Sequence, residues 1–352
     1  MNLDGPDLED RYRRVLRLLP GYYRDQWEED MVAAYLDSRV TGDADEDDYT
    51  FEFGRPAWPE VASVAALSAR LYLGGGGAPR RYFAWGQAVR RAVLAVTLVH
   101  ASQGLADLTL LVWRRHSGGL LPALPASLAV PTLDGNWPMV MNAVDSAWIV
   151  AFLALVLGHH RIARAIAALA VTADLIFLLQ AQFSGLLPRP LGTWSSFILL
   201  DLAPLLAMAA FHRDAPPTAP RPWLLALPGY YLLVPVPVMA LQATGHLAWL
   251  PDSAGLGCLV VVLACLAHAP RALSRSGRTA DSGVWSLALT LLAAVAGAWR
   301  IVSLGSYVHD PHLVKVSLTE LLILLAAAAL VVPDAARAQT AAPAPPPRPY
   351  PG

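Results

Sequence analysis

The sequence is poor in the charged residues that soluble proteins use to cover their surfaces. Only 15% of its 352 residues are charged, against about 25% in a typical soluble domain, and lysine occurs once, as Lys315. The chain has two cysteines, Cys258 and Cys265. They are separated by about 10 Å along a helix axis, which is too far for a disulfide. We expect both to be small packing residues.

The sequence also lacks the short motifs that carry known chemistries. It contains no His-Glu-x-x-His zinc helix, no Gly-x-Ser-x-Gly nucleophile elbow and no Gly-x-Gly-Asp run. We therefore predict that the chain is not an enzyme and has no catalytic residues, no metal site and no cofactor.

Long apolar stretches dominate what is present. The chain is 55% hydrophobic, its mean hydropathy is +0.44, and a helix needs about 20 apolar residues to cross a bilayer. The sequence predicts an all-α fold, a polytopic transmembrane bundle of about eight spans embedded in lipid. The predicted transmembrane domain covers residues 89–333, with spans near 91–113, 139–158, 162–182, 193–211, 222–242, 254–269, 284–303 and 315–333.

A small acidic module precedes the spans. Residues 1–73 hold 16 acidic residues against eight arginines, a balance that argues against nucleic-acid binding. Helical spacing predicts three helices, the first capped by Asp7, the second with Trp27, Met31, Ala34 and Tyr35 on its inner face, and the third over residues 60–73. An acidic loop is expected at 43–48, a Gly/Arg-rich hinge at 74–88, and a disordered Pro/Ala-rich tail at 334–352.

Arginine placement predicts the orientation. Arginines are concentrated before the first span and in the loops after spans two, four and six, whereas the alternate loops hold fewer. This bias favours a multi-pass protein of the bacterial plasma membrane with both termini in the cytoplasm. The N-terminus is polar, so we expect no signal peptide. The favoured cytoplasmic set comprises Arg80, Arg81, Arg90, Arg91, Arg161, Arg164, Arg213, Arg221, Arg271, Arg275 and Arg278.

The sequence of the N-terminal module resembles that of a known type of helical module. Its signature is the run Arg-Tyr-Arg-Arg-Val-Leu-Arg-Leu-Leu-Pro over residues 11–20, followed by Tyr23-Arg24 and by Trp-Glu-Glu-Asp-Met over 27–31. This pattern resembles a small helical module that precedes the spans of bacterial permease-like proteins and of actinobacterial membrane proteins associated with PadR-type regulators. The resemblance implies a regulatory or accessory module that faces the cytoplasm and contacts a protein partner through residues 1–73. It supplies no catalytic residues.

Seven ionisable residues inside the apolar stretches are the candidate ligand or ion site. Charged groups in hydrocarbon are costly and usually face other helices or water. The predicted topology puts most of this set in the outer half of the membrane, where one cavity could gather them. A structural role through hydrogen bonds and an Arg300 ion pair, and a site for a cation, proton or small polar ligand, both remain open. The set is His100, Asp107, Asp145, Asp174, Asp201, Arg300 and Glu320.

Two functions follow as hypotheses. The first is an accessory or regulatory membrane protein, in which the module contacts a cytoplasmic partner and the bundle faces a ligand on the outer side. The second is a small-solute or ion transporter that uses the intramembrane acids. Span five contains Pro228, Pro235 and Pro237, which predict either plain kinks or a broken helix that exposes backbone groups to a ligand.

Overall fold

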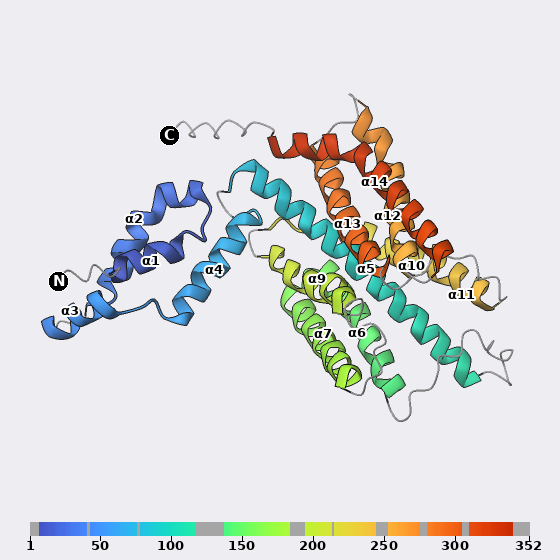
Figure 1. Cartoon of the computed structure of the whole chain (residues 1–352), viewed down its shortest axis with the longest axis horizontal. Coiled ribbons are helices and arrows are strands. Elements are labelled where there is room, and N and C mark those ends of the chain that lie inside the picture. The colour runs from blue at the N-terminus through green and yellow to red at the C-terminus, as the bar shows by residue number, and fades with distance from the viewer. Residues whose placement is uncertain are drawn as a thin grey trace. The chain divides into compact units, whose positions relative to one another are not determined.

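The computed structural model describes residues 7–40, 43–75, 78–116, 137–183, 194–212, 215–243, 253–274, 280–304 and 310–340. Every regular element within these ranges is a helix, so the predicted all-α fold is confirmed (Figure 1). The chain divides into two compact units, with the boundary between Gly86 and Gln87. The predicted tail residues 341–352 lie outside the described residues.

The first unit contains four helices around a small core. They are α1 (Leu8–Leu16), α2 (Gly21–Asp37), α3 (Ala44–Phe53) and α4 (Trp58–Tyr72). Asp7 caps α1 as predicted, because its Oδ1 accepts a hydrogen bond from the backbone N–H of Asp10 at 2.8 Å. The rings of Tyr12 and Tyr35 stack with centroids 3.9 Å apart. The buried core residues are Leu8, Tyr12, Leu16, Leu19, Val32, Tyr35, Val64 and Leu71.

Two predictions for this unit are wrong in detail. The expected acidic loop at 43–48 instead opens α3, which begins at Ala44. Acidic residues are favoured in a first turn because they face the positive end of the helix dipole. On α2, Trp27 is 43% exposed and Ala34 is exposed, whereas Val32 joins Tyr35 in the core.

The expected hinge at 74–88 is shorter than predicted. Helix α5 already begins at Arg80, and the Tyr82 ring contacts the rings of Tyr22 and Tyr72. Gly86 lies against the end of α4, since a Cβ there would meet the carbonyl oxygen of Leu73 at 1.9 Å. The start of α5 is thus packed within the first unit, and Gly74 supplies the turn with a φ of +83°.

The second unit holds a helix for each of the eight predicted spans. Six helical segments are long and apolar enough to cross a membrane, and two shorter apolar helices cover Val144–Val156 and Trp194–Ala210. The elements are α5 (Arg80–His116), α6 (Trp137–Val156), α7 (His160–Phe183), the π-helix η2 (Phe197–Leu202), α9 (Ala203–Ala207), η3 (Met208–Ala210), α10 (Pro220–Leu233), α11 (Pro235–Ala243), α12 (Ser253–Leu273), α13 (Ala280–Leu304) and α14 (Pro311–Thr340).

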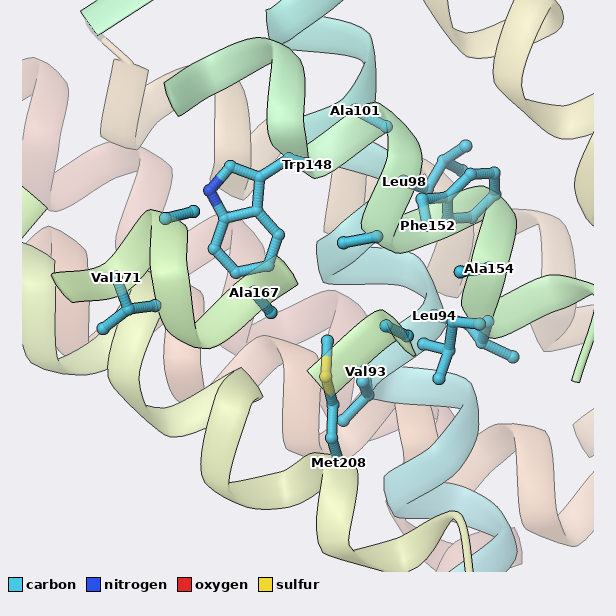
Figure 2. Close-up of a cluster of buried hydrophobic side chains, with 14 of the residues drawn as sticks. Val93, Leu94, Leu98, Ala101, Trp148, Phe152, Ala154, Ala167, Val171 and Met208 are labelled. Atoms are coloured by element: carbon cyan, nitrogen blue, oxygen red, sulfur yellow. The ribbon is translucent and has the colours of Figure 1, made fainter. Parts of the chain in front are cut away.

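Two apolar clusters hold these helices together. The first is centred on α5, α6 and α7, and Figure 2 shows Trp148 and Phe152 of α6 packed with small residues such as Ala101 and Ala167. Alanines let neighbouring helices approach closely, which favours association in membranes. The second cluster joins α12, α13 and α14 and contains both cysteines as buried free thiols, as predicted.

Large aliphatic side chains also cover the outside of the unit. Leu169, Leu225 and Leu322 are 69%, 74% and 67% exposed, and a soluble protein rarely leaves so many such side chains in water. Together with the six long apolar helices, this surface identifies a multi-pass membrane protein.

Two helix boundaries depart from the predicted spans. Span five is interrupted at Val234, because α10 ends at Leu233 and α11 begins at Pro235, which has no N–H for the carbonyl four residues earlier. The predicted tail at 334–352 begins too early, because α14 continues to Thr340. Asp334 and Ala335 are buried in that last part of the helix, which explains why it stays helical.

Candidate functional site

Four of the predicted site residues come together in the second unit. Asp107 of α5, Asp145 of α6, Asp174 of α7 and Asp201 of η2 are called the aspartate group below. Asp145 interacts electrostatically with the other three, and Asp174 also interacts with Asp201. Four consecutive helices therefore each bring one carboxyl group, and Asp145 lies within electrostatic range of the other three.

A glycine permits the close approach of α5 to Asp145 of α6. Gly104 lies one turn before Asp107 on α5, and a Cβ at Gly104 would meet the backbone oxygen of Asp145 at 2.4 Å. No other residue type could occupy this position without moving α6, because the obstacle is backbone rather than a flexible side chain. The contact between Gly104 and this backbone oxygen fixes the position of Asp145 relative to α5.

His100 connects α5 to the π-helix that carries Asp201. Its Nε2 lies 2.9 Å from the carbonyl oxygen of Leu200 and 3.6 Å from Oδ1 of Asp201. Since a carbonyl only accepts, this Nε2 carries a proton and donates it. The imidazole also stacks on the indole of Trp148, with ring centroids 4.6 Å apart.

Proline explains why this carbonyl is available. Pro204 stands four residues after Leu200, where an α-helix would supply an N–H donor, and proline has none. The backbone around Asp201 adopts π-helical geometry over Phe197–Leu202, and π-helical turns are frequent at functional sites. His100 thus satisfies a backbone group that the local sequence leaves without its usual partner.

Two polar side chains of α5 lie beside members of the aspartate group. Gln103 donates to Asp107 at 3.3 Å, and the imidazole of His100 lies beside Asp201. Within the described ranges, Asp145 and Asp174 have neither a hydrogen bond nor a basic partner. The same ranges contain no group of three or more His, Cys, Asp or Glu side chains arranged to hold a metal ion. The arrangement suits a proton or a hydrated cation better than a tightly chelated metal.

The other two predicted site residues pair with each other. Arg300 of α13 is only 2% exposed, and its guanidinium forms an ion pair with the carboxylate of Glu320 on α14. This confirms one of the expected pairings of Arg300. The pair joins α13 to α14, whereas the aspartate group belongs to α5, α6, α7 and η2.

A buried polar network was not predicted. Oδ2 of Asp334 accepts hydrogen bonds from Oγ of Ser282 at 3.1 Å and Oγ of Ser286 at 2.9 Å. Nε2 of His268 lies 3.1 Å from the same Ser286 hydroxyl, so the network joins α12, α13 and α14. The spacing of Ser282 and Ser286, one turn apart on a single helix face, is the signal that could have revealed it.

Two cavities flank Trp285 at the start of α13. One, of about 610 Å³, is lined by His268, Arg271, Asp281, Ser282 and Trp285 together with apolar residues. The other, of about 540 Å³, is lined by Arg90, Arg91, Trp223, Asp281 and Trp285 among others. Neither is lined by a member of the aspartate group.

Asp281 and Trp285 line both cavities, and the guanidinium of Arg91 contacts both of these residues. It pairs with the carboxylate of Asp281 and lies over the ring of Trp285 at 4.7 Å, a cation–π arrangement. Trp285 in turn stacks on Trp223, with centroids 6.1 Å apart. This contact ties α5, α10 and α13 together.

Comparisons with protein-family models, with curated proteins and with solved structures found no match to the chain. The residues of the aspartate group and of the cavities are therefore the guide to its function.

Proposed function

We propose that the chain is an accessory or regulatory membrane protein whose bundle binds a proton or a hydrated cation at the aspartate group. In this proposal the N-terminal module binds a cytoplasmic protein partner, and both termini lie in the cytoplasm of a bacterium. The observation that carries it is that Asp145 of α6 lies within electrostatic range of three carboxyl groups on three other helices. The resemblance of residues 8–73 to a regulatory module is the basis for proposing a protein partner.

Electrostatics supports a positively charged ligand. Carboxylates within interaction range repel one another strongly when little water screens them, and ionisable residues between transmembrane helices commonly mark ion paths or proton relays. His100 stands beside one of the four carboxylates. A bound proton or cation would relieve the remaining repulsion.

Helix ends support the proposed topology. Arg91 at the start of the predicted first span, Trp223 near the start of α10 and Asp281 near the start of α13 meet one another. His268 and Asp334, near the ends of α12 and α14, join Ser282 of the same region. Arginine bias assigns all five of these helix ends to the cytoplasmic side, which leaves the aspartate group toward the opposite face.

The module offers a surface for a protein partner. Tyr49, Phe53 and Trp58 are 68%, 56% and 82% exposed, and the Tyr49 and Phe53 rings lie 5.2 Å apart. Exposed aromatic side chains are enriched in protein interfaces. The acidic balance of residues 1–73 favours a partner with a basic face.

Carbodiimide labelling tests the ligand site. A carbodiimide modifies protonated carboxyl groups in apolar surroundings, and mass spectrometry locates the modified residue. In full-length protein in nanodiscs, we expect labelling of the aspartate group to fall as pH or cation concentration rises. Asp145→Asn should alter the pH dependence at Asp174 and Asp201, whereas Asp25→Asn, an exposed acid of the first unit, should not. Labelling that is indifferent to pH, cations and Asp145→Asn would contradict the proposal.

The alternative is an ion or small-solute transporter, and the break between α10 and α11 favours it. Interrupted helices expose backbone groups at the binding sites of many transporters. Proteoliposomes with an internal pH dye separate the two functions. A transporter dissipates an imposed ion gradient and loses that flux in Asp145→Asn, whereas an accessory protein shows no flux with either chain.

Crosslinking tests the partner. A photoreactive amino acid in place of Trp58 should capture a defined protein in native membranes, and the same group at Leu322, on the exposed face of α14, should not capture it. Deletion of residues 1–73 should abolish the associated phenotype. An unchanged phenotype after this deletion would remove the regulatory part of the proposal.

A further inference from the structure

The second cavity contains an arginine whose charge is not balanced. Arg90 lines the cavity of about 540 Å³ and is only 6% exposed. Among the described residues its electrostatic neighbours are Arg91 and His160, and neither is a carboxylate. Its guanidinium also has no hydrogen-bond acceptor within those residues.

The adjacent arginine shows the contrast. Arg91 has the carboxylate of Asp281 and the face of Trp285 as partners, so its charge is compensated inside the same cavity. The Arg91–Asp281 pair is neutral in sum, which leaves the positive charge of Arg90 as the excess. A buried charge without a counter-ion is strongly unfavourable, and native proteins pair such groups or bind an ion to them.

The rest of the wall fits an oxyanion. Helix α10, 14 residues long, begins at Pro220 beside the cavity. Pro220 and Pro222 have no N–H, so the backbone N–H of Arg221 is the donor at the start of this helix. This N–H and the positive end of the helix dipole favour a negative ligand. Thr218 and Gln87 also line the cavity and add a hydroxyl and an amide donor.

We propose that this cavity binds a phosphate group, with the Arg90 guanidinium as its counter-ion and the start of α10 as a second contact. Arginine matches the geometry of phosphate oxygens through two parallel hydrogen bonds. Two sources carry this chemistry, the headgroup of an anionic phospholipid and a free phosphate compound. Basic pockets between transmembrane helices bind anionic lipid headgroups, and Trp223 and Trp285 in the wall are typical of the membrane interface. The site does not depend on the aspartate group.

Binding to the full-length protein tests this inference and separates the sources. In neutral detergent, native mass spectrometry measures retention of phosphatidylglycerol against phosphatidylcholine, and thermal shifts measure binding of inorganic phosphate. A lipid site retains phosphatidylglycerol alone, whereas a site for a soluble ligand responds to phosphate. Either result supports a phosphate site, and a chain that binds neither probe overturns it.

Substitutions locate the site. Arg90→Gln should weaken binding about tenfold or more, because a charge-assisted hydrogen bond is lost. Thr218→Val leaves the charge of Arg90 in place and should weaken binding by a few fold. This variant still tests the site if Arg90→Gln folds poorly. Arg161→Gln, an exposed arginine of α7, is the matched control and should bind as the unaltered chain does. Unchanged binding in both Arg90→Gln and Thr218→Val would overturn the assignment.

A counter-ion within the chain is the rival explanation. Asp214 lies two residues before the cavity residue Pro216 and outside the described residues. If this carboxylate neutralises Arg90, the unaltered chain binds neither probe and Asp214→Asn gains binding. That pattern would overturn the proposal, whereas binding that is equal in both chains supports it.

Discussion

The imidazole Nε2 of His100 lies 2.9 Å from the carbonyl oxygen of Leu200, four residues before Pro204. A side chain of one helix therefore takes the place of a backbone donor that proline removes from another. The hydrogen bond also holds His100 3.6 Å from the carboxylate of Asp201. The hydrogen bonding of the Leu200 carbonyl in η2 and the position of the His100 side chain therefore depend on one another.

A double-mutant cycle measures this dependence. His100→Phe leaves the Leu200 carbonyl without its donor and should destabilise the chain by about 1–3 kcal/mol. In a Pro204→Ala background, the new N–H of residue 204 can bond that carbonyl, so the same change should cost less. We expect a coupling free energy of about 1 kcal/mol from detergent-unfolding curves. Additive effects would show that Pro204 does not determine the role of His100.

Gly104 should be intolerant of any side chain. Gly104→Ala forces a Cβ toward the backbone oxygen of Asp145, which lies at 2.4 Å from the ideal Cβ position, and overpacking of this kind costs about 1–3 kcal/mol. Gly229→Ala is the matched control, since a Cβ there meets nothing within 4 Å. Its effect should be neutral or stabilising by up to about 1 kcal/mol. Equal losses in the two variants, measured as free energies of unfolding, would refute the close approach.

The Arg300–Glu320 pair should respond asymmetrically to substitution. Arg300→Met leaves the Glu320 carboxylate without this partner, and the loss of one member of a buried pair costs about 3–5 kcal/mol. The double change Arg300→Met with Glu320→Leu removes both charges and should recover most of that loss. Thermal midpoints of the three chains check the expectation, and a double variant as unstable as the single one would contradict it.

Alkaline pH should loosen the N-terminal unit. Burial raises the pKa of Tyr12, helped by Tyr35 and Glu60, so the folded unit keeps a proton that the unfolded chain releases. Its contribution to stability is complete below the ordinary tyrosine pKa of about 10 and is lost as pH rises through the folded value. Hydrogen exchange of the α1 peptide should therefore accelerate above that pH. Tyr12→Phe should reduce the acceleration, and Tyr49→Phe, at an exposed position, should not.

The sequence predicts the apolar helices well because bilayer length and hydropathy act within each segment. It predicts their ends less well, since ends depend on other helices. Asp334 looks like the start of a polar tail, yet Ser282 and Ser286 of α13 supply its hydrogen bonds and keep α14 helical. The loop expected at 43–48 is wrong for a local reason, because acidic residues favour the first turn of a helix and α3 begins at Ala44.

The sequence predicts how deep the candidate residues lie in the membrane, but not which of them lie close together. Arginine bias and span position predict that most of the seven candidate residues lie in the outer half of the membrane. Which of them lie close together depends on which helix faces pack, and Gly104 permits one such contact, between α5 and Asp145. Arg90 and Arg91 are indistinguishable as neighbours in the sequence. Only the fold shows that Asp281 partners Arg91 and that Arg90 is buried against the cavity.

One uninterrupted helix carries contacts to both sites. Arg91 and His100 are nine residues apart on α5, about 14 Å along its axis. Arg91 pairs with Asp281 of α13, and His100 donates a hydrogen bond to the Leu200 carbonyl of η2. A helix is stiff along its axis, so sliding or rotating α5 would have to break both attachments together. This segment of α5 therefore couples the two sites mechanically. A ligand that moves α5 at Arg91 also changes the geometry at His100, and the reverse holds as well.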